Sequence, residues 1–469
     1  MNLRWTFSKI ALMTVLVAVT TLSGTASLAL TQESNLPSSP VVVPTAQMPD
    51  GTSTRGGTLT ADNVDNPKTF NPITQSEASS SAVTGLMNAA LIDETGTATV
   101  AQGVTVSADQ TRVTVTLREG LKFSDGEPLT AADVVFTLED VVFNPLIQST
   151  QRDAWRINGQ FPSVEAPDDM TVVIAAPVPF SGMLSALAST PILPQHLLQD
   201  AVQNGNFASA WDISTDPEQI AGLGPFRLAG FTPDQQVVLE RNPYYWKVDQ
   251  DGTQLPYLDR IVMPITTDNN VRTLRFTNGQ TDVYAPRPED VPVLRQQSNV
   301  SVRVQQAGTV DMNTIAFNQD TSDPQLRELF RDVRFRQAMA YAANREAMIS
   351  SNLNGLGESR YGPGIASEFW IQDQSGFPSF AFNLDKANEL LDEIGVAMGD
   401  DGFRHFDNGD VVEFTLLTNQ GSTVLTNDAV LFADTLEQVG IKVNVRPVEL
   451  NALINQILSG DPPPYEAAR

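Results

Sequence analysis

The stretch EGLKFSDGEPLTAADVVFTLEDVVFNP, residues 119–145, carries a dense series of local structural signals. It follows a strand-like segment, and Gly120 and Gly126 can adopt the positive φ that tight turns require. Phe123 lies between the two glycines and is expected to anchor the turn in a hydrophobic core, while Asp125 can bond to its own backbone. We interpret this part as scaffold that ends a strand and leads into a helix.

The second half of the same stretch predicts that helix. Thr130 has the N-cap position, and Asp133 follows three residues later, which is a capping box with Asp in place of the usual Glu. Apolar residues then recur at helical spacing and predict one buried stripe: Val134, Val135, Leu138, Val141 and Val142. Nothing in the pattern requires a catalytic role.

Strand and helix signals alternate through the rest of the chain, which predicts an α/β fold. The expected strands include residues 57–61, 111–117 and 171–175, and the first helix is expected near residues 80–91. Later helix faces are predicted from apolar residues at positions 335, 338, 339 and 342, and at 387, 390, 391 and 394 with Asp385 as the cap.

A β-α-β unit is predicted near the C-terminus. The strand at 412–417, the helix at 429–439 and the strand at 441–445 imply parallel pairing. A further helix ends at Gly460, and the next strand is expected to lie beyond Arg469. The last lobe is therefore expected to be incomplete at its C-terminus.

Composition limits the class of protein. A chain of 469 residues predicts two or three domains, and its formal charge of -26 disfavours binding to phosphate backbones of nucleic acids. There is no cysteine, so disulfides, thiolate metal sites and lipid attachment through Cys are excluded.

The N-terminus has the layout of a secretory signal peptide over residues 1–29. Arg4 and Lys9 precede an apolar run, and small residues allow cleavage after Ala26 or Ala29, although an uncut membrane anchor stays open. Residues 30–55 are rich in Pro, Ser and Thr and predict a flexible linker. We therefore expect an exported, periplasmic or otherwise extracytoplasmic protein.

The sequence lacks the common motifs of enzyme sites. It contains no phosphate-binding Gly-x-x-x-x-Gly-Lys, no His-Glu-x-x-His and no Gly-x-Ser-x-Gly. Its two histidines are expected to be structural, with His196 in packing or capping and His405 exposed to solvent. The acidic segments at 249–252 and 407–410 lack calcium-loop spacing and are interpreted as turns. We expect no catalytic residue, no metal and no cofactor.

A series of segments resembles one family of proteins. Residues 119–140, EGLKFSDGEPLTAADVVFTLED, are similar to the signature region of the bacterial extracellular solute-binding proteins of family 5. Further segments resemble successive landmarks of that family in the same order: SVEAPDDMTVVIAAPVP (163–179), PILPQHLL (191–198), GLGPFRLAGF (222–231), VVLERNPYYWKVDQDGTQLPYLDRIVM (237–263), FTNGQTDVY (276–284), RDVRFRQAMAYAANREAMI (331–349) and EQVGIKVNVRPVE (437–449).

The resemblance implies a two-lobe periplasmic-binding-protein fold of type II-like topology, with hinged lobes and mixed sheets. The first lobe would span residues 56–284, with an extra subdomain at about 80–190, and the second lobe residues 285–469. The implied function is that of the substrate-binding component of an ABC importer, a monomer that captures an oligopeptide or dipeptide by hinge closure. Its partners would be the ligand and the membrane subunits of the transporter.

Loops at strand ends supply the expected ligand contacts, because ligands of α/β folds bind near the carboxyl ends of strands. The expected contacts are Thr74, Gln75, Tyr284, Asn318, Tyr361, Trp370, Asn419 and Gln420. Each has a structural alternative, such as a turn or helix cap for Thr74 and Asn318 and a packing role for Tyr284 and Trp370. An oligosaccharide, a metal chelate, a role in sensing or adhesion, or a secreted hydrolase stay open as alternatives.

Overall fold

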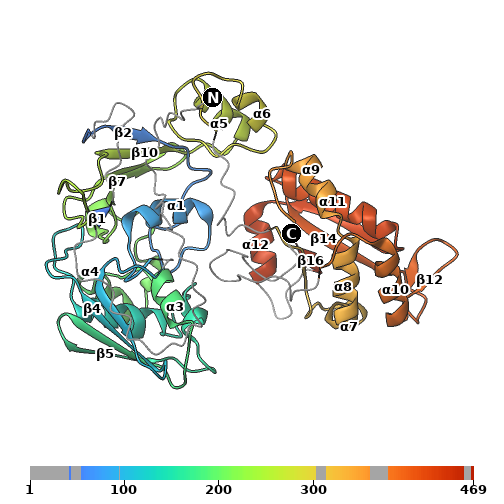
Figure 1. The fold of residues 1–469 in the computed structure, drawn as a ribbon, viewed down its shortest axis with the longest axis horizontal. Coiled ribbons are helices and arrows are strands. Elements are labelled where there is room, and N and C mark those ends of the chain that lie inside the picture. The colour runs from blue at the N-terminus through green and yellow to red at the C-terminus, as the bar shows by residue number, and fades with distance from the viewer. Residues whose placement is uncertain are drawn as a thin grey trace, which may run out of the picture. The chain divides into compact units, whose positions relative to one another are not determined.

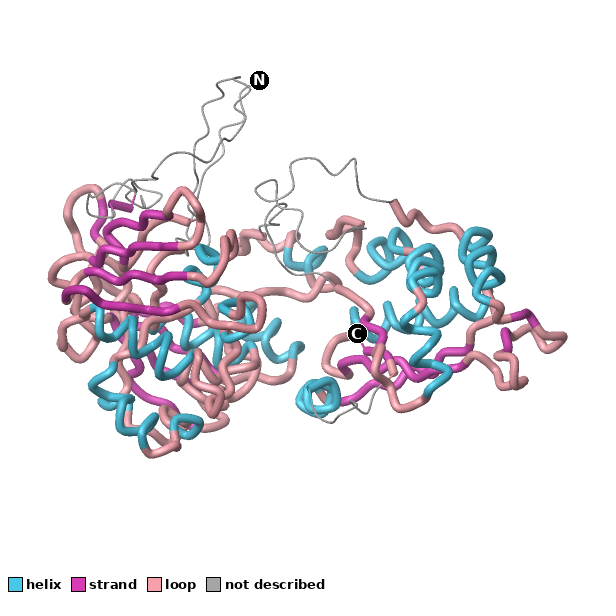
Figure 2. The backbone as a smooth tube through the Cα atoms, turned by 90° about the horizontal axis from the view of Figure 1, so that it is seen from below, coloured by secondary structure: helices cyan, strands magenta, loops and turns pink. Residues whose placement is uncertain are grey.

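The computed structural model describes residues 42–43, 54–93, 96–302, 313–359, 379–458 and 466–468. The chain divides into two compact units, Met1–Tyr284 and Ala285–Arg469, called here the N-terminal and the C-terminal unit. Each unit combines helices and strands, as Figures 1 and 2 show. In the part of the chain that the structure describes, no helix has the length and apolar character needed to cross a membrane.

One four-stranded sheet of the N-terminal unit has the order β2-β10-β8-β7. Strand β10 pairs in parallel with β2 and antiparallel with β8, and β8 pairs antiparallel with β7. Its strands are β2 (Thr58–Thr60), β7 (Phe226–Thr232), β8 (Gln236–Arg241) and β10 (Arg260–Pro264).

A second four-stranded sheet of the same unit has the order β3-β4-β6-β5 and is antiparallel throughout. Its strands are β3 (Ala101–Val106), β4 (Arg112–Leu117), β5 (Ser163–Asp168) and β6 (Thr171–Ala175). Side chains from both sheets contribute to one hydrophobic core, so the two sheets belong to a single packed body. The alternating pattern predicted for residues 111–117 is confirmed, because Val113, Val115 and Leu117 are buried.

Helices and short elements complete the N-terminal unit. The helices are α1 (Ala78–Met87), α2 (Ala131–Val135), the π-helix η1 (Phe136–Val142), α3 (Met183–Ser189), α4 (Gln195–Gln203) and α5 (Asn269–Thr277). Three 3-10 turns are η2 (Arg152–Trp155), η3 (Phe207–Ser209) and η4 (Pro217–Gln219), and a two-stranded sheet joins β1 (Val42–Val43) to β9 (Val248–Asp249).

The turns predicted in residues 119–145 are confirmed. Gly120 and Gly126 have φ values of 74° and 99°, and Phe123 is fully buried. The backbone N–H of Thr130 donates to the Asp133 carboxylate at 2.9 Å, as the capping box requires.

The stripe predicted after Thr130 is confirmed at Val134, Leu138, Val141 and Val142, which are all buried, although the second half of the helix is not an α-helix. From Phe136 the helix is a π-helix, and the N–H of Phe143 donates to the carbonyl of Leu138, five residues earlier. Each wider turn rotates the buried face relative to 3.6-residue spacing. The prediction is wrong at Val135, which is only half-buried, and it missed Phe136, which is buried.

The loop before β7 packs against the last turn of α1 so closely that the two backbones are in direct contact. The N–H of Gly224 donates to the carbonyl of Met87 at 2.8 Å, and the N–H of Ser124 donates to the carbonyl of Gly222 at 3.0 Å. A Cβ at position 224 would lie 2.5 Å from the carbonyl oxygen of Leu86, and one at position 222 would lie 2.1 Å from that of Met87. Only glycine fits at these two positions without a backbone shift.

We predict that Gly224→Ala destabilises the protein by about 1–3 kcal/mol, the range typical of overpacking. The measurement is the free energy of unfolding in urea. Gly230→Ala is the control, because a Cβ there meets no atom within 4 Å and Gly230 lies in β7. Equal destabilisation by the two substitutions would contradict the packing argument.

The main sheet of the C-terminal unit has the order β11-β16-β14-β15. Strand β14 pairs in parallel with β15 and β16, and β11 pairs antiparallel with β16. Its strands are β11 (Ala316–Phe317), β14 (Glu413–Asn419), β15 (Lys442–Val448) and β16 (Ala467–Ala468), and a separate hairpin joins β12 (Ala397–Met398) to β13 (Arg404–His405).

The helices of this unit are α6 (Val291–Leu294), α7 (Pro324–Arg331), α8 (Val333–Ala342), α9 (Arg345–Asn352), α10 (Leu384–Ile394), α11 (Thr423–Glu437) and α12 (Leu450–Leu458). The face predicted for α8 is confirmed, because its four apolar residues are all buried. The predicted parallel β14-α11-β15 unit is confirmed by a continuous register from Glu413–Lys442 to Asn419–Val448.

Two sequence predictions for this unit are wrong. Asn383, not Asp385, caps α10, because its side chain accepts from the N–H of Lys386 at 2.9 Å. A strand does follow α12 within the sequence, since β16 adds to β14. His405, which was expected to be exposed, is partly exposed at 27 %. Its contacts with the Asp401 carboxylate and the carbonyl of Gly409 raise the pKa of His405 above its usual value.

Arg404 connects three separate parts of the C-terminal unit from a buried position. Its side chain is 2 % exposed, and it donates to the carbonyls of Val439 and Val396 at 2.8 and 2.6 Å. It also donates to the side chains of Asn388 and Asp392 at 2.8 and 2.6 Å. The planar guanidinium thus satisfies several acceptors that no shorter side chain reaches.

We predict that Arg404→Met destabilises the protein by at least about 2 kcal/mol, because two buried carbonyls lose their donor. Asp392→Asn should cost less than about 1 kcal/mol, since the Asp392 carboxylate is 67 % exposed and the pair is screened by solvent. Urea unfolding of both variants checks the difference. A larger loss in Asp392→Asn than in Arg404→Met would show that the ion pair, not the carbonyl contacts, matters.

Candidate functional site

The carboxyl ends of β2 and β10 form one polar strand edge in the N-terminal unit. Beyond β2 the chain continues in parallel bridges, Ala61 with Val283 and Asn63 with Ile265. Parallel strands of α/β proteins bring ligand-binding loops together at this end. The first side chains beyond this edge are therefore candidates for function.

Asp62 is the most buried charge at this edge. Its side chain is 2 % exposed, and its Oδ1 accepts from the Thr266 hydroxyl at 3.0 Å and lies 3.3 Å from Nε of Arg275. Its Oδ2 is buried and has no hydrogen-bond partner among the described residues. A buried carboxylate needs a cationic partner and hydrogen bonds, and Arg275 on α5 supplies the cation. Sequence reasoning missed Asp62, although its place directly after a predicted strand was a usable signal.

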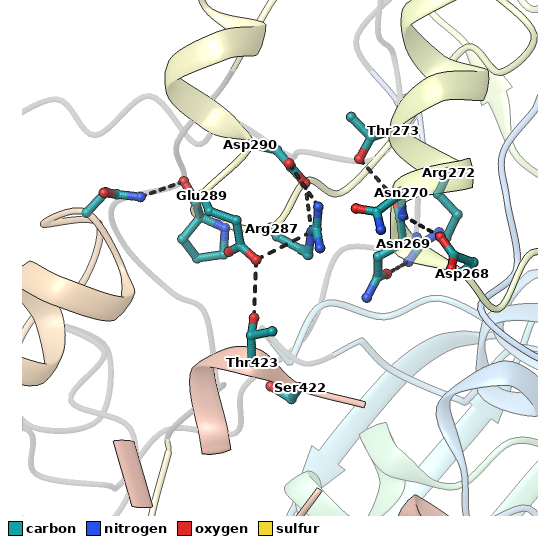
Figure 3. Close-up of polar contacts among 12 residues, drawn as sticks. Asp268, Asn269, Asn270, Arg272, Thr273, Arg287, Glu289, Asp290, Ser422 and Thr423 are labelled. Atoms are coloured by element: carbon teal, nitrogen blue, oxygen red, sulfur yellow. Dashed lines mark hydrogen bonds and ion pairs between the residues drawn. The ribbon is translucent and has the colours of Figure 1, made fainter. Parts of the chain in front are cut away.

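Tyr284 is held against α5. Its hydroxyl lies 2.9 Å from Oγ1 of Thr273, and its ring centroid is 5.6 Å from that of Phe276. The guanidinium carbon of Arg272 lies 5.3 Å from the centre of the Tyr284 ring, a cation-π contact. Figure 3 shows Arg272 and Thr273 on the same helix. Tyr284 is half-buried, so it packs on α5 and also keeps some exposed surface.

Thr74 and Gln75 lie together in the loop before α1. The Gln75 side chain accepts from the hydroxyl of Thr84, on α1. The alternative that Thr74 caps this helix is wrong, because the carboxylate of Glu77 accepts from the N–H of Ser80 at 2.6 Å. The hydroxyl oxygen of Thr74 is buried without a hydrogen-bond partner among the described residues. The Thr74 hydroxyl can therefore still donate one hydrogen bond and accept others.

Asn419 and Gln420 lie together at the carboxyl end of β14 in the C-terminal unit. Oδ1 of Asn419 accepts from the N–H of Gly421 at 2.9 Å, which shapes the turn into α11. The N–H of Gln420 donates to the carbonyl of Val448 at 2.9 Å, while its side chain is exposed. Ser422 then caps α11 by accepting from Leu425 at 3.3 Å. This strand-turn-helix arrangement exposes amide and hydroxyl groups at one edge of the sheet.

Asn318 lies away from this edge. It follows β11, which runs antiparallel to β16 and hence to β14, and its N–H donates to the carbonyl of Glu466 at 2.7 Å. The register places Asn318 beyond the level of Leu416, toward the amino end of β14. Its side chain is buried and accepts from the N–H of Asp320 at 3.0 Å, so the turn role is present.

The other two predicted contacts, Tyr361 and Trp370, lie outside the described residues. Within the described ranges, no group of three or more His, Cys, Asp or Glu side chains is arranged to hold a metal ion. His196, in the first turn of α4, contacts the Asp125 carboxylate at 2.8 Å and packs edge-on to Phe123, so it has the packing role that was expected. Four of the predicted contacts thus lie in two polar loops on separate units, Tyr284 packs against α5, and Asn318 lies apart from these loops.

Comparison with known proteins identifies the family. The model of the bacterial extracellular solute-binding proteins, family 5 (middle part), matches residues 97–466. This chain belongs to that family. The resemblance seen in the sequence is confirmed, and so is the two-lobe α/β periplasmic-binding-protein fold that it implied.

Relatives and solved structures support the assignment. A probable ABC transporter-binding protein of Deinococcus radiodurans is 32% identical over 421 residues, which cover 85% of this chain and 70% of that protein. The structure of the oligopeptide-binding protein AppA from Bacillus subtilis with a nonapeptide has a TM-score of 0.73 and 26% identity, covering 89% of this chain and 79% of that one. MelB from Agrobacterium fabrum with stachyose has a TM-score of 0.72 and 24% identity, covering 92% and 70%, and shows the fold alone.

Proposed function

We propose that this family 5 protein is the substrate-binding component of an ABC importer and that its ligand is an oligopeptide or dipeptide. The observation that carries the proposal is the likeness to AppA, whose structure was solved with a nonapeptide and which is similar over 89% of this chain. The Deinococcus relative, described as ABC transporter-binding, supports the transport role.

Capture follows from a two-lobe architecture. A ligand that binds both lobes stabilises the closed arrangement, so its differential affinity for that arrangement shifts the open-closed equilibrium. The membrane subunits of the importer then recognise the closed protein and accept the ligand chemically unchanged. The protein acts as an exported monomer outside the cytoplasm, with residues 1–29 as its signal peptide, and it performs no catalysis.

Peptide recognition uses groups that the strand-end loops offer. Backbone amides of an extended peptide pair with amide and hydroxyl side chains, while roomy pockets tolerate different side chains. We assign ligand contact first to Thr74, Gln75, Asn419 and Gln420, because they lie at strand-end loops of the two units. Tyr284, Asn318, Tyr361 and Trp370 complete the proposed set.

Peptide binding is tested by thermal shift and calorimetry on the whole chain, with di- to nonapeptides and with stachyose as the sugar comparison. A true ligand at 100 times its Kd adds about 2.7 kcal/mol to stability and raises Tm. We expect a shift with peptides, none with stachyose, and intact peptide recovered by mass spectrometry. A shift with stachyose alone, or a cleaved peptide, would overturn the proposal.

We predict that Asn419→Asp weakens peptide binding about tenfold, equivalent to about 1.4 kcal/mol. The substitution keeps the oxygen that accepts from Gly421 but removes the NH2 donor, so the turn survives while a donor to a peptide carbonyl is lost. Calorimetry measures Kd, and Tm of the ligand-free protein should barely change. The control is Asn383→Asp, an equivalent change at the cap of α10, where unchanged affinity is expected. Unchanged affinity in Asn419→Asp would remove this residue from the site.

A further inference from the structure

Helix α5 differs from the other α-helices of the N-terminal unit in how it is attached. The helices α1 to α4 each bury at least one apolar side chain, such as Val83 of α1 and Leu198 of α4. None of the nine residues of α5 is fully buried, and Val271 and Leu274 on this helix are 49 % and 62 % exposed. Because a hydrophobic face is the usual attachment of a helix, α5 needs other contacts to stay in place.

The start of α5 is satisfied locally. Asp268 caps the helix, because its carboxylate accepts from the backbone N–H of Asn270 at 2.8 Å. Figure 3 shows this cap together with the contact between Arg272 and Asn269 in the first turn. The rest of the unit therefore has to supply the attachment of α5 rather than its cap.

A buried carboxylate provides such an attachment. Asp62 lies on the continuation of β2 between Ala61 and Asn63, which both bridge to neighbouring segments, so its backbone is held in place. Its Oδ1 lies 3.3 Å from Nε of Arg275 on α5, and its side chain is 2 % exposed, compared with 31 % for Arg275. Loss of one partner from a buried ion pair leaves an uncompensated charge, so the pair resists separation. It fixes α5 to the strand edge, with Asp62 as the rigid member.

Helix α5 in turn holds the ring of Tyr284. The Tyr284 hydroxyl lies 2.9 Å from Oγ1 of Thr273, and its ring centroid lies 5.6 Å from that of Phe276. The guanidinium carbon of Arg272 lies 5.3 Å from the centre of the same ring. Since these partners lie on one helix, the position of the ring depends on the position of α5.

We propose that Asp62 is a positioning residue: through Arg275 it fixes α5 to the strand edge, and α5 thereby fixes the ring of Tyr284 for ligand contact. The inference rests on the proposed function, because the position of the ring matters for capture only if Tyr284 contacts the ligand. Without the charge of Asp62, α5 keeps its cap but loses a buried attachment. The helix then opens from the unit at a lower free energy than the strands of the same sheet.

The first test measures hydrogen exchange in the ligand-free whole chain. Asp62→Asn keeps an oxygen that can accept from Thr266 but removes the charge beside Arg275. We expect amides of residues 272–278 to exchange at least about tenfold faster, while those of β8 stay as in the parent, because local opening of a helix is separate from opening of the sheet. Urea unfolding of the same variant shows whether the whole unit is loosened.

Fluorine NMR adds a readout that a general loss of stability does not move. The chain contains seven tyrosines, and labelling with 3-fluorotyrosine reports on each ring, with Tyr→Phe variants to assign the signals. In Asp62→Asn the signal of Tyr284 should shift or broaden. The signal of Tyr245, which is buried elsewhere in the unit, should stay unchanged. An unchanged Tyr284 signal overturns the proposal.

Variants at Arg275 test the ion pair from its more exposed side, so the test holds even if Asp62→Asn impairs folding. Arg275→Met should have the same effects on α5, and the double variant should add nothing further, since both changes remove one shared interaction. Arg275→Lys keeps a cation and should restore part of the protection. The control Glu240→Gln removes a carboxylate that pairs with Arg227 in the sheet of β7 and β8, and it should change neither readout.

Peptide affinity links the ion pair to capture. The probe is the peptide that gives the largest thermal shift among the di- to nonapeptides, and calorimetry measures its Kd. Asp62→Asn should weaken binding about fivefold in the parent but not in a Tyr284→Ala background, which has no ring to position. Equal weakening in both backgrounds, or faster exchange of α5 in Glu240→Gln, overturns the proposal. A parent that binds no peptide counts against the proposed function instead, while exchange and fluorine NMR still test the attachment of α5.

Discussion

The N-terminal unit depends on one close contact between backbones, where the loop at residues 222–224 lies on the last turn of α1. The carbonyl of Met87 accepts from Gly224, and any side chain at either glycine would overlap the main chain of α1. The same loop accepts from Ser124, so the turn of residues 119–126 is fixed to α1 as well. Strand β7 begins directly after the loop, which places the sheet containing β2 and β10. The position of the polar edge beyond β2 therefore depends on the contact of residues 222–224 with α1, in which only glycine fits at positions 222 and 224.

The charged side chains of Asp62 and Arg404 are buried in the interior of this protein. The chain carries a formal charge of -26. The carboxylate of Asp62 is buried beside Arg275 and Thr266, and removing a charge from water is costly without such partners. Arg404 is a buried cation instead, and its guanidinium donates mainly to main-chain carbonyls. Both groups hold helices to strand ends or turns.

Ligand capture by a two-lobe protein requires rigid units and a compliant connection between them. The hydrogen bond from the N–H of Thr60 to the Asp282 carboxylate fixes the chain to β2 just before the N-terminal unit ends, and Glu289 accepts from Thr423 on α11 within the C-terminal unit. Pro286 and Pro288 lie between these two contacts and limit the freedom of the backbone there.

The sequence by itself determined the local structure and the family. The turns at Gly120 and Gly126, the Thr130 capping box, the α8 face and the parallel β14-α11-β15 unit follow from spacing and propensity, which act within a few residues. Tertiary structure alone decided the π-helix after Phe136, the cap of α10 at Asn383 and the direction of β11, which moves Asn318 away from Asn419. It also decided the burial of Asp62 with Arg275 and the contact of Glu289 with Thr423. These pairs are separated by more than a hundred residues, and no local pattern encodes which distant group will contact a given carboxylate.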